Sequence, residues 1–377
     1  MGRDNARVTG VAAAEPDAAA VMRTFGLGDR VLSMHPLKGA WSNRVYRLVT
    51  DRGEFAVKQL LNPWQDPRWA EWLDESWRFE LAAYDAGTDM PEPIPNPKNG
   101  SWLGHVPARG SRAANVAPTN ATRPGEMGSR SGQGDRGLDG TGLVTVRVHR
   151  WVNGAAPGNG PVTMRIARWA GRTLATLHGL GHEPGDKSLF PQFDTVTADH
   201  WPELTALVAR HNVAWRTRIA IVTDTIAAMA RLARDAQNTA EPEVMSHGDL
   251  RQKNLILTAD GPVLCDWDVA APVVPVRDLA SVALTLGSWK RFDVGRAVVA
   301  AYRDAGGDAR TARPEDLGPS LMVNLDWIAF NVERALGLHG ATPRDVALGN
   351  QLVPGLLARL PRQLEASLRV AELFAPR

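Results

Sequence analysis

The sequence contains a single cysteine, Cys265, so an intrachain disulfide is excluded. One cysteine in a chain of this length is typical of a reducing compartment. No apolar run approaches the roughly 20 residues that a membrane-spanning helix needs. The first 17 residues also lack the apolar core of a signal peptide. We therefore expect a cytoplasmic protein that has no membrane partner.

Neither sign of charge is in excess. The chain has 43 Lys and Arg against 41 Asp and Glu, a net charge of +2, and it has no block of basic residues. This balance excludes the broad positive surface that nucleic-acid binding requires. The hydrophobic fraction of 44% and the charged fraction of 22% are those of an ordinary globular protein, and 377 residues are enough for two packed lobes.

The first 150 residues predict a β-rich lobe. A short helix is expected at 17–25 and a longer one at 66–86, where apolar residues recur at helical spacing. Alternating apolar residues and turn signals predict strands at 31–37, 41–49, 54–60, 101–106 and 143–151. Residues 107–142 are rich in Gly, Ser, Arg and Asn and have almost no large apolar side chain, which predicts a flexible insertion in a hairpin.

The rest of the chain predicts a mainly helical lobe. Helices are expected at 162–180, 215–236, 294–305, 321–336 and 352–374, with one small β-element at 255–265. We therefore expect an N-terminal lobe at 1–150 and a C-terminal lobe at 151–377, joined near residues 151–154.

The strongest chemical signal is His247-Gly248-Asp249 with Asn254 and, further on, Asp266. Two short apolar strands about the turn Asp260-Gly261 predict a hairpin that places Asn254 opposite or diagonal to Asp266. Oxygen ligands of this kind suit Mg²⁺, which completes its shell with water and phosphate oxygens. The Asp249 carboxylate lies just upstream and could accept a proton from a hydroxyl group. This arrangement is what phosphoryl transfer requires.

These motifs resemble those of the aminoglycoside phosphotransferase and choline kinase-like family, which is distantly related to the protein kinases. The resemblance implies an α+β, two-lobed protein kinase-like fold, with a small β-rich N-terminal lobe containing one main helix and a larger, mostly helical C-terminal lobe. It implies that Asp249 is the catalytic base and that Asn254 and Asp266 bind Mg²⁺. Arg251 stands where protein kinases have Lys, and we expect it to act near the γ-phosphate or the substrate.

The resemblance extends to the N-terminal lobe. Ala56-Val57-Lys58 is similar to the kinase strand whose lysine contacts the α- and β-phosphates of the nucleotide, which implies that role for Lys58. A carboxylate on the following helix should hold this lysine. Glu80 is the preferred candidate because it precedes an apolar, inward-facing position, and Glu75 and Glu71 are alternatives.

The remaining nucleotide-binding groups are expected in two loops. The loop between the first two strands lacks a Gly-x-Gly-x-x-Gly motif, but Gly39, Ser42 and Asn43 lie where backbone N–H groups or a hydroxyl can meet phosphate oxygens. The hinge between the lobes, with His149 and Trp151, should receive the nucleobase of ATP or GTP.

Several residues also have a purely structural interpretation. His247 is expected to brace its loop through hydrogen bonds. Asp268 could bind a second metal ion or face solvent in a turn. Asp278 is expected to cap a helix or brace the loop, and Cys265 to be an inert residue of a buried strand.

The acceptor site is expected on the C-terminal helices. Asp326, Trp327 and Glu333 lie on one predicted helix, and such groups suit a cationic sugar or amine. The same pattern equally fits a solvated helix face.

The sequence therefore predicts in-line transfer of the γ-phosphate of Mg·ATP or Mg·GTP to the hydroxyl of a small molecule. The favoured acceptor is an antibiotic of the aminoglycoside type. One alternative is a metabolic kinase acting on an amino alcohol, sugar or amino acid. A protein kinase is disfavoured because no Ala-Pro-Glu segment follows Asp266. The presence of Lys58, Asp249, Asn254 and Asp266 argues against a catalytically dead binding module.

Overall fold

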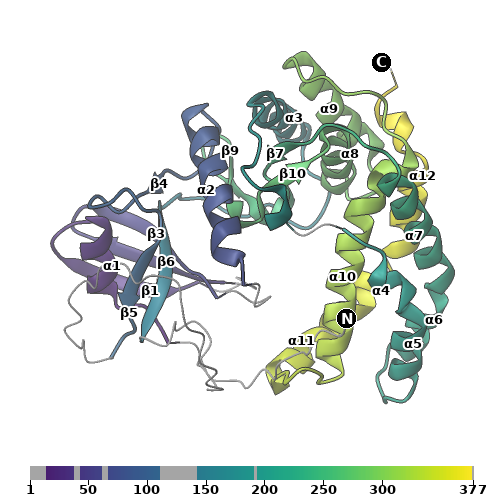
Figure 1. Cartoon of the computed structure of the whole chain (residues 1–377), viewed down its shortest axis with the longest axis horizontal. Helices are drawn as coiled ribbons and strands as arrows, with labels where there is room; N and C mark the ends of the chain where they lie inside the picture. The colour runs from purple at the N-terminus through teal and green to yellow at the C-terminus, as the bar shows by residue number, and fades with distance from the viewer. Residues whose placement is uncertain (1–13, 38–42, 62–66, 111–141, 191–192, 376–377) are drawn as a thin grey trace. The chain divides into compact units, whose positions relative to one another are not determined.

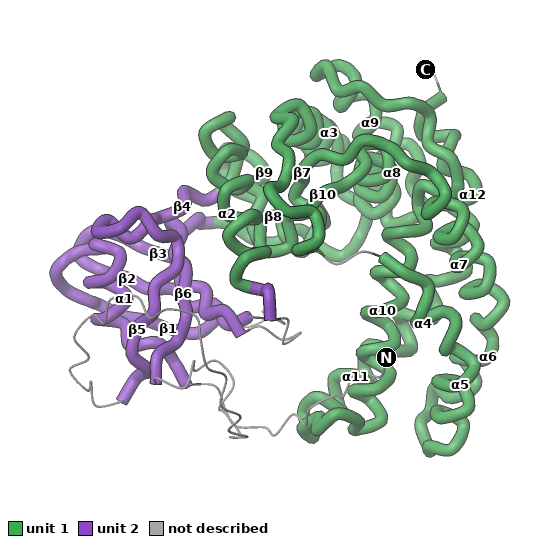
Figure 2. The backbone as a smooth tube through the Cα atoms, viewed as in Figure 1, with its two compact units in different colours: residues 1–10, 70–90, 154–377 green, residues 11–69, 91–153 purple. Residues whose placement is uncertain are grey.

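The computed structural model describes residues 14–37, 43–61, 67–110, 142–190 and 193–375 (Figure 1). Contacts divide the chain into two units, which Figure 2 colours separately. The strand-rich unit comprises residues 11–69 and 91–153, and the helical unit includes residues 70–90 and 154–377. Gly39 and Ser42 lie outside the described residues, as do residues 111–141 of the expected insertion.

Antiparallel strands form the sheet of the strand-rich unit. Its described strands follow the order β1-β2-β3-β6-β4, and β5 also pairs with β6. Their bounds are β1 Val31–Pro36, β2 Arg44–Thr50, β3 Gly53–Gln59, β4 Pro93–Ile94, β5 Gly104–Pro107 and β6 Leu143–Arg150. The predicted strands are confirmed, and β4, in a proline-rich segment, is a further strand beyond those predicted from the sequence.

One face of this sheet carries the core of the unit. The helix α1 (Ala18–Phe25) begins at Asp17, whose carboxylate accepts the N–H of Ala20, and ends at Gly26 with a φ of 64°. Its buried residues pack with Tyr46, Leu48, Phe55, Val57 and the valines of β6. Because side chains alternate along β3, Lys58 lies on the sheet face opposite to Val57.

The helical unit is built around three helices that lie side by side: α3 (Met164–Gly179), α8 (Pro275–Leu286) and α9 (Phe292–Asp304) (Figure 1). A Cβ atom at Gly171 would lie 2.2 Å from the carbonyl oxygen of Val298, so glycine permits the close approach of α3 and α9. The other α-helices are α2 Trp69–Asp85, α4 Val196–Asp199, α5 Trp201–Ala209, α6 Arg216–Ile221, α7 Thr223–Gln237, α10 Gly318–Ala335, α11 Pro343–Leu357 and α12 Leu360–Leu368.

Two of the predicted helices are wrong as continuous elements. The helix expected at 215–236 is interrupted at Val222, which lies outside helical geometry (φ −91°, ψ 1°) and is buried at 4% exposure. Val222 ends α6 and begins α7, and its carbonyl accepts the N–H of Ile226 at 2.9 Å, so the chain re-enters a helix after one non-helical residue. The helix expected at 352–374 is divided into the end of α11, α12 and a 3₁₀ turn (Val370–Leu373). Pro361, which has no N–H to donate, lies in the first turn of α12 and marks a new helix start.

The described helices include none that is both long and apolar enough to cross a membrane.

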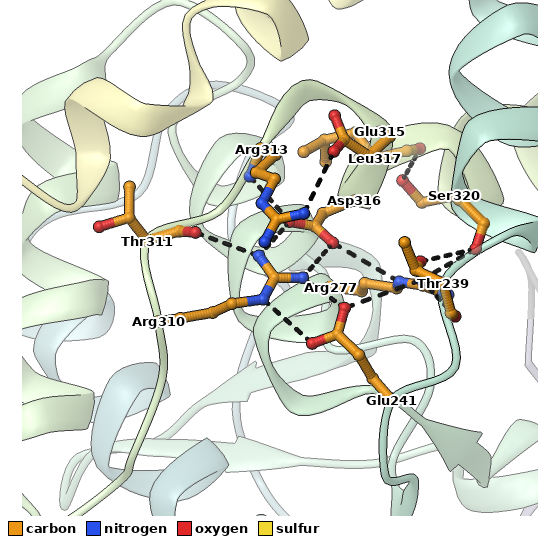
Figure 3. A network of polar contacts seen from close by, with 11 residues as sticks. Thr239, Glu241, Arg277, Arg310, Thr311, Arg313, Glu315, Asp316, Leu317 and Ser320 are labelled. Atoms are coloured by element: carbon orange, nitrogen blue, oxygen red, sulfur yellow. Dashed lines mark hydrogen bonds and ion pairs between the residues drawn. The ribbon is translucent and has the colours of Figure 1, made fainter.

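A network of charged side chains connects the first turn of α8 with the segment at residues 310–316 (Figure 3). Asp316 is 1% exposed and accepts hydrogen bonds from Nη1 and Nη2 of Arg310 at 2.7 and 2.8 Å. Arg310 also donates to Glu241 through Nε at 3.0 Å. Burial raises the pKa of Asp316, but the hydrogen bonds from Arg310 and from the backbone N–H of Arg313 outweigh this effect and hold the pKa below its usual value. The network fixes Arg277, which precedes Asp278 on α8.

We expect Arg310→Met to lower the free energy of unfolding by about 3 kcal/mol, because it leaves a buried carboxylate without its main cation. The loss should shrink in acid. Since folding depresses the pKa of Asp316, its ionised form stabilises the fold above the unfolded pKa of about 3.9, and this contribution disappears as the pH falls through the folded value. Urea unfolding at neutral and acid pH measures both effects.

Arg313→Met is the matched control. Its side chain is 58% exposed and lies 3.8 Å from Glu315, so its removal should cost less than about 1 kcal/mol. Equal losses in the two variants would show that Arg310 does not hold the network together.

Candidate functional site

Two short sheets in the helical unit frame the loop at residues 247–254. β7 (Val244–Ser246) pairs with β10 (Ala271–Val273) just before this loop, and the hairpin of β8 (Leu255–Leu257) and β9 (Pro262–Leu264) follows it. Gly248 has a φ of 73°, and a Cβ atom there would lie 2.5 Å from the carbonyl oxygen of Val269. The loop therefore requires glycine at this position.

The Asp249 carboxylate lies among hydrogen-bond donors and is 14% exposed. Its Oδ1 atom lies 2.7 Å from Nε of Arg251, and its Oδ2 atom lies 2.7 Å from Nζ of Lys253. The Asn254 side chain donates from Nδ2 to Oδ2 at 2.9 Å and to the backbone carbonyl of Asp249 at 2.8 Å. A carboxylate has about four acceptor positions. Only the Asn254 contact is a hydrogen bond to the carboxylate, and the two cations contact it as ion pairs, so acceptor capacity remains for a hydroxyl group.

His247 is fully buried and braces the loop. Its Nδ1 atom accepts the N–H of Asp249 at 3.2 Å, and its Nε2 atom lies 3.1 Å from the carbonyl oxygen of Cys265. These contacts define a neutral ring that carries its proton on Nε2. Burial lowers the pKa of His247 in spite of the nearby carboxylates of Asp249 and Asp266. The imidazole therefore acts as a neutral support at physiological pH.

The open end of the β8–β9 hairpin presents the two predicted metal ligands. Leu255 pairs with Leu264, and the N–H of Cys265 donates to the carbonyl of Asn254 at 2.9 Å. Cys265 is therefore the residue across the hairpin from Asn254, and Asp266 is the next residue after it. The Asn254 amide nitrogen is held by Asp249, and its Oδ1 atom makes no hydrogen bond with the residues that the structure describes. Asp266 adopts a left-handed conformation (φ 72°, ψ 62°) and is exposed. An amide oxygen and a carboxylate fit a Mg²⁺ ion.

No group of three or more His, Cys, Asp or Glu side chains in the described ranges is arranged to bind a metal ion. The predicted pair of Asn254 and Asp266 is a smaller donor set, of the kind that leaves most of the Mg²⁺ shell to water and phosphate.

A buried chain of hydrogen bonds anchors β7 immediately before the loop. Ser246 donates from Oγ to Oδ2 of Asp278 at 2.6 Å, and Nε2 of His178 lies 3.2 Å from the same oxygen. The Tyr302 hydroxyl lies 3.1 Å from Nδ1 of His178. Burial opposes ionisation of Asp278, but the hydrogen bonds from His178 and Ser246 hold its pKa below the usual value. Burial also raises the pKa of Tyr302 to about 12, so the phenol keeps its proton.

The helix α2 also packs beside this region within the helical unit. Ser76 and Trp72 both donate to the carbonyl oxygen of Ala270, at 3.0 and 3.4 Å. Glu80 is completely buried, whereas Glu75 is engaged by Arg78 at 2.8 Å and by the N–H of Gly185. A buried carboxylate needs a cation or several donors. The pairing of Glu80 with Lys58 stays a prediction, and Glu75 has partners of its own.

In the strand-rich unit, Lys58 pairs with Arg147 of β6 and with Val45 of β2. Paired residues point to the same sheet face, so Arg147 shares the face of Lys58. Arg147 is only 1% exposed, and its guanidinium lies over the Trp102 ring at 5.2 Å. The sequence reading missed this second cation. The signal that could have found it is a charged residue at an alternating position of an otherwise apolar strand.

The predicted loop and hinge residues are tied into the same sheet. The Oδ1 atom of Asn43 accepts the N–H of Leu61 at 3.1 Å. This hydrogen bond joins the two chain segments at the open end of the β2–β3 hairpin. His149 lies in β6 and pairs with Ala56. The backbone N–H of Trp151 donates to the carbonyl of Glu54 at 3.0 Å, so this N–H is already used within the sheet. Contact with a nucleobase through Trp151 would therefore require another of its groups.

The sequence profile of the phosphotransferase enzyme family (APH) matches residues 33–317. The chain belongs to this family. The predicted family and the predicted class of enzyme, a phosphotransferase, are both confirmed. No curated protein matches the sequence.

Solved structures of other phosphotransferases share the fold. A spectinomycin phosphotransferase, solved with ADP and spectinomycin, is 10% identical with a TM-score of 0.58 over 91% of this chain and 94% of its own. An amicoumacin kinase, solved with AMP-PNP and Ca²⁺, is 10% identical with a TM-score of 0.55 over 92% and 94%. A microcompartment-associated aminopropanol kinase is 16% identical with a TM-score of 0.56 over 93% and 99%. The predicted kinase-like fold class is thus confirmed.

The predicted acceptor residues of this phosphotransferase lie on α10. Trp327 stacks on Phe330 with ring centroids 5.6 Å apart, and both rings are partly exposed. A carboxylate oxygen of Glu333 lies 3.3 Å from Nε2 of His339. Asp326 lies on the same helix. Whether this face binds an acceptor stays a prediction.

The phosphotransferase site contains two further groups that the sequence reading did not assign. Lys253 contacts Asp249 directly, and Ser246 connects the loop to Asp278. The sequence contains a signal for the Lys253 contact, since the side chain of a lysine four residues after the predicted base can reach that base. The sequence contains no comparable signal for Ser246, because its partner Asp278 is 32 residues away in the sequence.

We expect Asp278→Ala to loosen β7 and the 247–254 loop, because the change leaves Ser246 and His178 without their acceptor. The free energy of unfolding should fall by about 3 kcal/mol. Amide hydrogen exchange in peptides covering 244–254 should accelerate more than exchange elsewhere. Asp278→Asn keeps an oxygen acceptor at the position of Oδ2, so it should have a clearly smaller effect.

Asp304→Ala serves as the control, since this carboxylate is exposed at the end of α9. Unchanged exchange of the loop in Asp278→Ala would show that the buried chain does not anchor it.

Proposed function

We propose that this chain transfers the γ-phosphoryl group of Mg·ATP or Mg·GTP to a hydroxyl group of a small molecule. Residues 1–150 form the nucleotide-binding lobe in this proposal, and residues 151–377 form the catalytic and acceptor-binding lobe. Family membership supports the reaction class.

One observation carries the proposal. The Asn254 amide donates two hydrogen bonds to Asp249, and its oxygen is left without a hydrogen bond to the described residues. A single side chain thus orients a carboxylate base and presents a metal ligand. Phosphoryl transfer depends mainly on such positioning.

Each residue of the loop has a role in this proposal. Asp249 orients the acceptor hydroxyl and takes its proton as the oxygen attacks phosphorus. The guanidinium group of Arg251 has N–H donors available for the phosphoryl oxygens. Asn254 and Asp266 would hold Mg²⁺. The metal ion supplies charge neutralisation at the phosphates when bound. His247 stays neutral and keeps the loop backbone in place.

The strand-rich unit supplies the nucleotide contacts in this proposal. Lys58, held by Glu80, would bind the α- and β-phosphates, and Gly39, Ser42 and Asn43 would cover them. His149 and Trp151 belong to the proposed hinge. Solved relatives bound to ADP, AMP-PNP or GDP, one of them with Ca²⁺, support the use of a purine nucleotide and a divalent cation.

The acceptor is proposed to be an antibiotic, since two similar structures are named as kinases of spectinomycin and amicoumacin. The similarity to an aminopropanol kinase supports an amino alcohol as the second candidate. A panel of aminoglycosides, other hydroxyl-bearing antibiotics, amino alcohols, sugars and amino acids separates the two. ADP or GDP release gives the rate, and mass spectrometry of the acceptor detects the added phosphoryl group.

We expect Asp249→Asn to reduce kcat by about 100-fold or more, because the amide cannot take the hydroxyl proton. The dissociation constant of the nucleotide should change by less than about three-fold, since the substitution removes no group proposed to contact the nucleobase or the α- and β-phosphates. Steady-state kinetics with an acceptor from the panel, together with calorimetric titration of AMP-PNP, measures both values.

The control is Asp260→Asn, an exposed carboxylate in the turn between β8 and β9 that contributes neither the proposed base nor a proposed metal ligand. If Asp249→Asn kept the wild-type kcat, the base assignment would be wrong. A panel without any phosphorylated member would contradict the proposed function itself.

A further inference from the structure

Lys253 differs from the other groups around Asp249 in being widely exposed on a fixed backbone. Its side chain is 63% exposed, and its ammonium contacts only Asp249 among the described residues. On one side of it, Gln252 donates from Nε2 to the carbonyl oxygens of Gly160 and Thr285 at 3.2 and 3.1 Å. On the other side Asn254 is 3% exposed and held by Asp249. The hydrogen bonds of its two neighbours therefore fix the backbone position from which the Lys253 side chain extends.

The position of the ammonium is set relative to the reacting group. An acceptor hydroxyl that gives its proton to Asp249 must lie within about 3 Å of a carboxylate oxygen. The Lys253 nitrogen already lies 2.7 Å from Oδ2 of that carboxylate. Since the hydroxyl can meet either carboxylate oxygen, the ammonium must consequently lie within about 8 Å of the reacting oxygen. This distance reaches the substituents on the neighbouring carbon of the acceptor.

Most N–H donors of the two cations beside Asp249, Arg251 and Lys253, remain available for a ligand. Arg251 approaches Asp249 through Nε, and its terminal nitrogens make no hydrogen bond with the described residues. The Lys253 ammonium forms an ion pair with Asp249 and likewise makes no hydrogen bond with the described residues, so its donors remain available. Arg251 alone can serve the phosphoryl oxygens as a planar fork. The compact positive charge of the Lys253 ammonium can then interact with a different anionic group.

We infer that Lys253 selects the acceptor by charge and favours a hydroxyl compound that bears an anionic group next to the reacting hydroxyl. This inference rests on the proposed function and specifies its acceptor. A cationic substituent at that position is repelled by the ammonium at a separation where unit charges still interact appreciably. A cationic antibiotic would thus have to react at a hydroxyl distant from its amino groups.

Three two-carbon alcohols test the inference, because they differ only in the group beside the hydroxyl. Glycolate carries a carboxylate there, ethylene glycol a neutral hydroxyl and ethanolamine an ammonium. The wild-type enzyme should have a kcat/KM for glycolate about ten-fold above that for ethanolamine, as expected for one charge pair within about 8 Å in a partly solvated site. Lys253→Met should remove this preference, and Lys253→Glu should reverse it.

Lys290→Met is the matched control, since Lys290 is an exposed lysine in the loop between α8 and α9. It should leave the preference unchanged. Thermal unfolding and AMP-PNP binding of each variant show that the fold and the nucleotide site are intact, as expected for an exposed side chain.

Each other outcome overturns the inference. A uniform loss of rate with all three alcohols in Lys253→Met would assign the ammonium to the transferred phosphoryl group. A wild-type preference for ethanolamine, or a preference that Lys253→Met does not change, would show that another group selects the acceptor. Failure with these three alcohols, together with success elsewhere in the panel, would also count against it. Absence of phosphorylation throughout would remove the proposed function as well.

Discussion

The candidate site depends on one side chain amide. Asn254 donates to both the backbone carbonyl and the carboxylate of Asp249, so the loop between them closes on itself. The same residue begins the hairpin that leads to Asp266, because its carbonyl accepts the N–H of Cys265. An aspartate at position 254 could not donate these bonds, and it would place a second negative charge beside Asp249. The proposed base and the proposed metal ligand therefore share one geometric constraint, which is why this spacing carries more information than either residue alone.

The charges of the site are arranged by burial. Groups that hold the loop are buried and either neutral, as in His247, or surrounded by donors, as in Asp278. Groups that can meet ligands, Arg251 and Lys253, are partly or widely exposed. Buried support costs little when every polar atom has a partner, whereas exposed cations can change partner easily. The support is thus rigid, and the reactive side of the loop can adapt to nucleotide and acceptor.

The sequence predicted the parts that local spacing determines. The β8–β9 hairpin follows from two short apolar runs about Asp260-Gly261, and its register then places Asp266 beside Asn254. The strands around Lys58 follow from alternation and turn residues. Long-range contacts could not be predicted in this way. The oxygen that Ser246 and His178 share belongs to Asp278, which approaches from a different helix. The break at Val222 could not be predicted either, because residues 215–236 contain no glycine or proline that would signal it.

The backbone of Asp266 shows why the neighbouring aromatic residue matters. A left-handed conformation at a residue other than glycine costs on the order of 1 kcal/mol and persists only where the surroundings enforce it. Trp267 supplies this enforcement. It is 2% exposed, packs edge-on against His247 at 4.7 Å and contacts Phe79 of α2. Its indole N–H lies 3.4 Å from the carbonyl of Leu264, so the ring also fastens to the hairpin that precedes it. The backbone of Asp266 therefore lies next to a buried ring that also contacts His247, and the proposed metal ligand and the proposed base are connected a second time through the core.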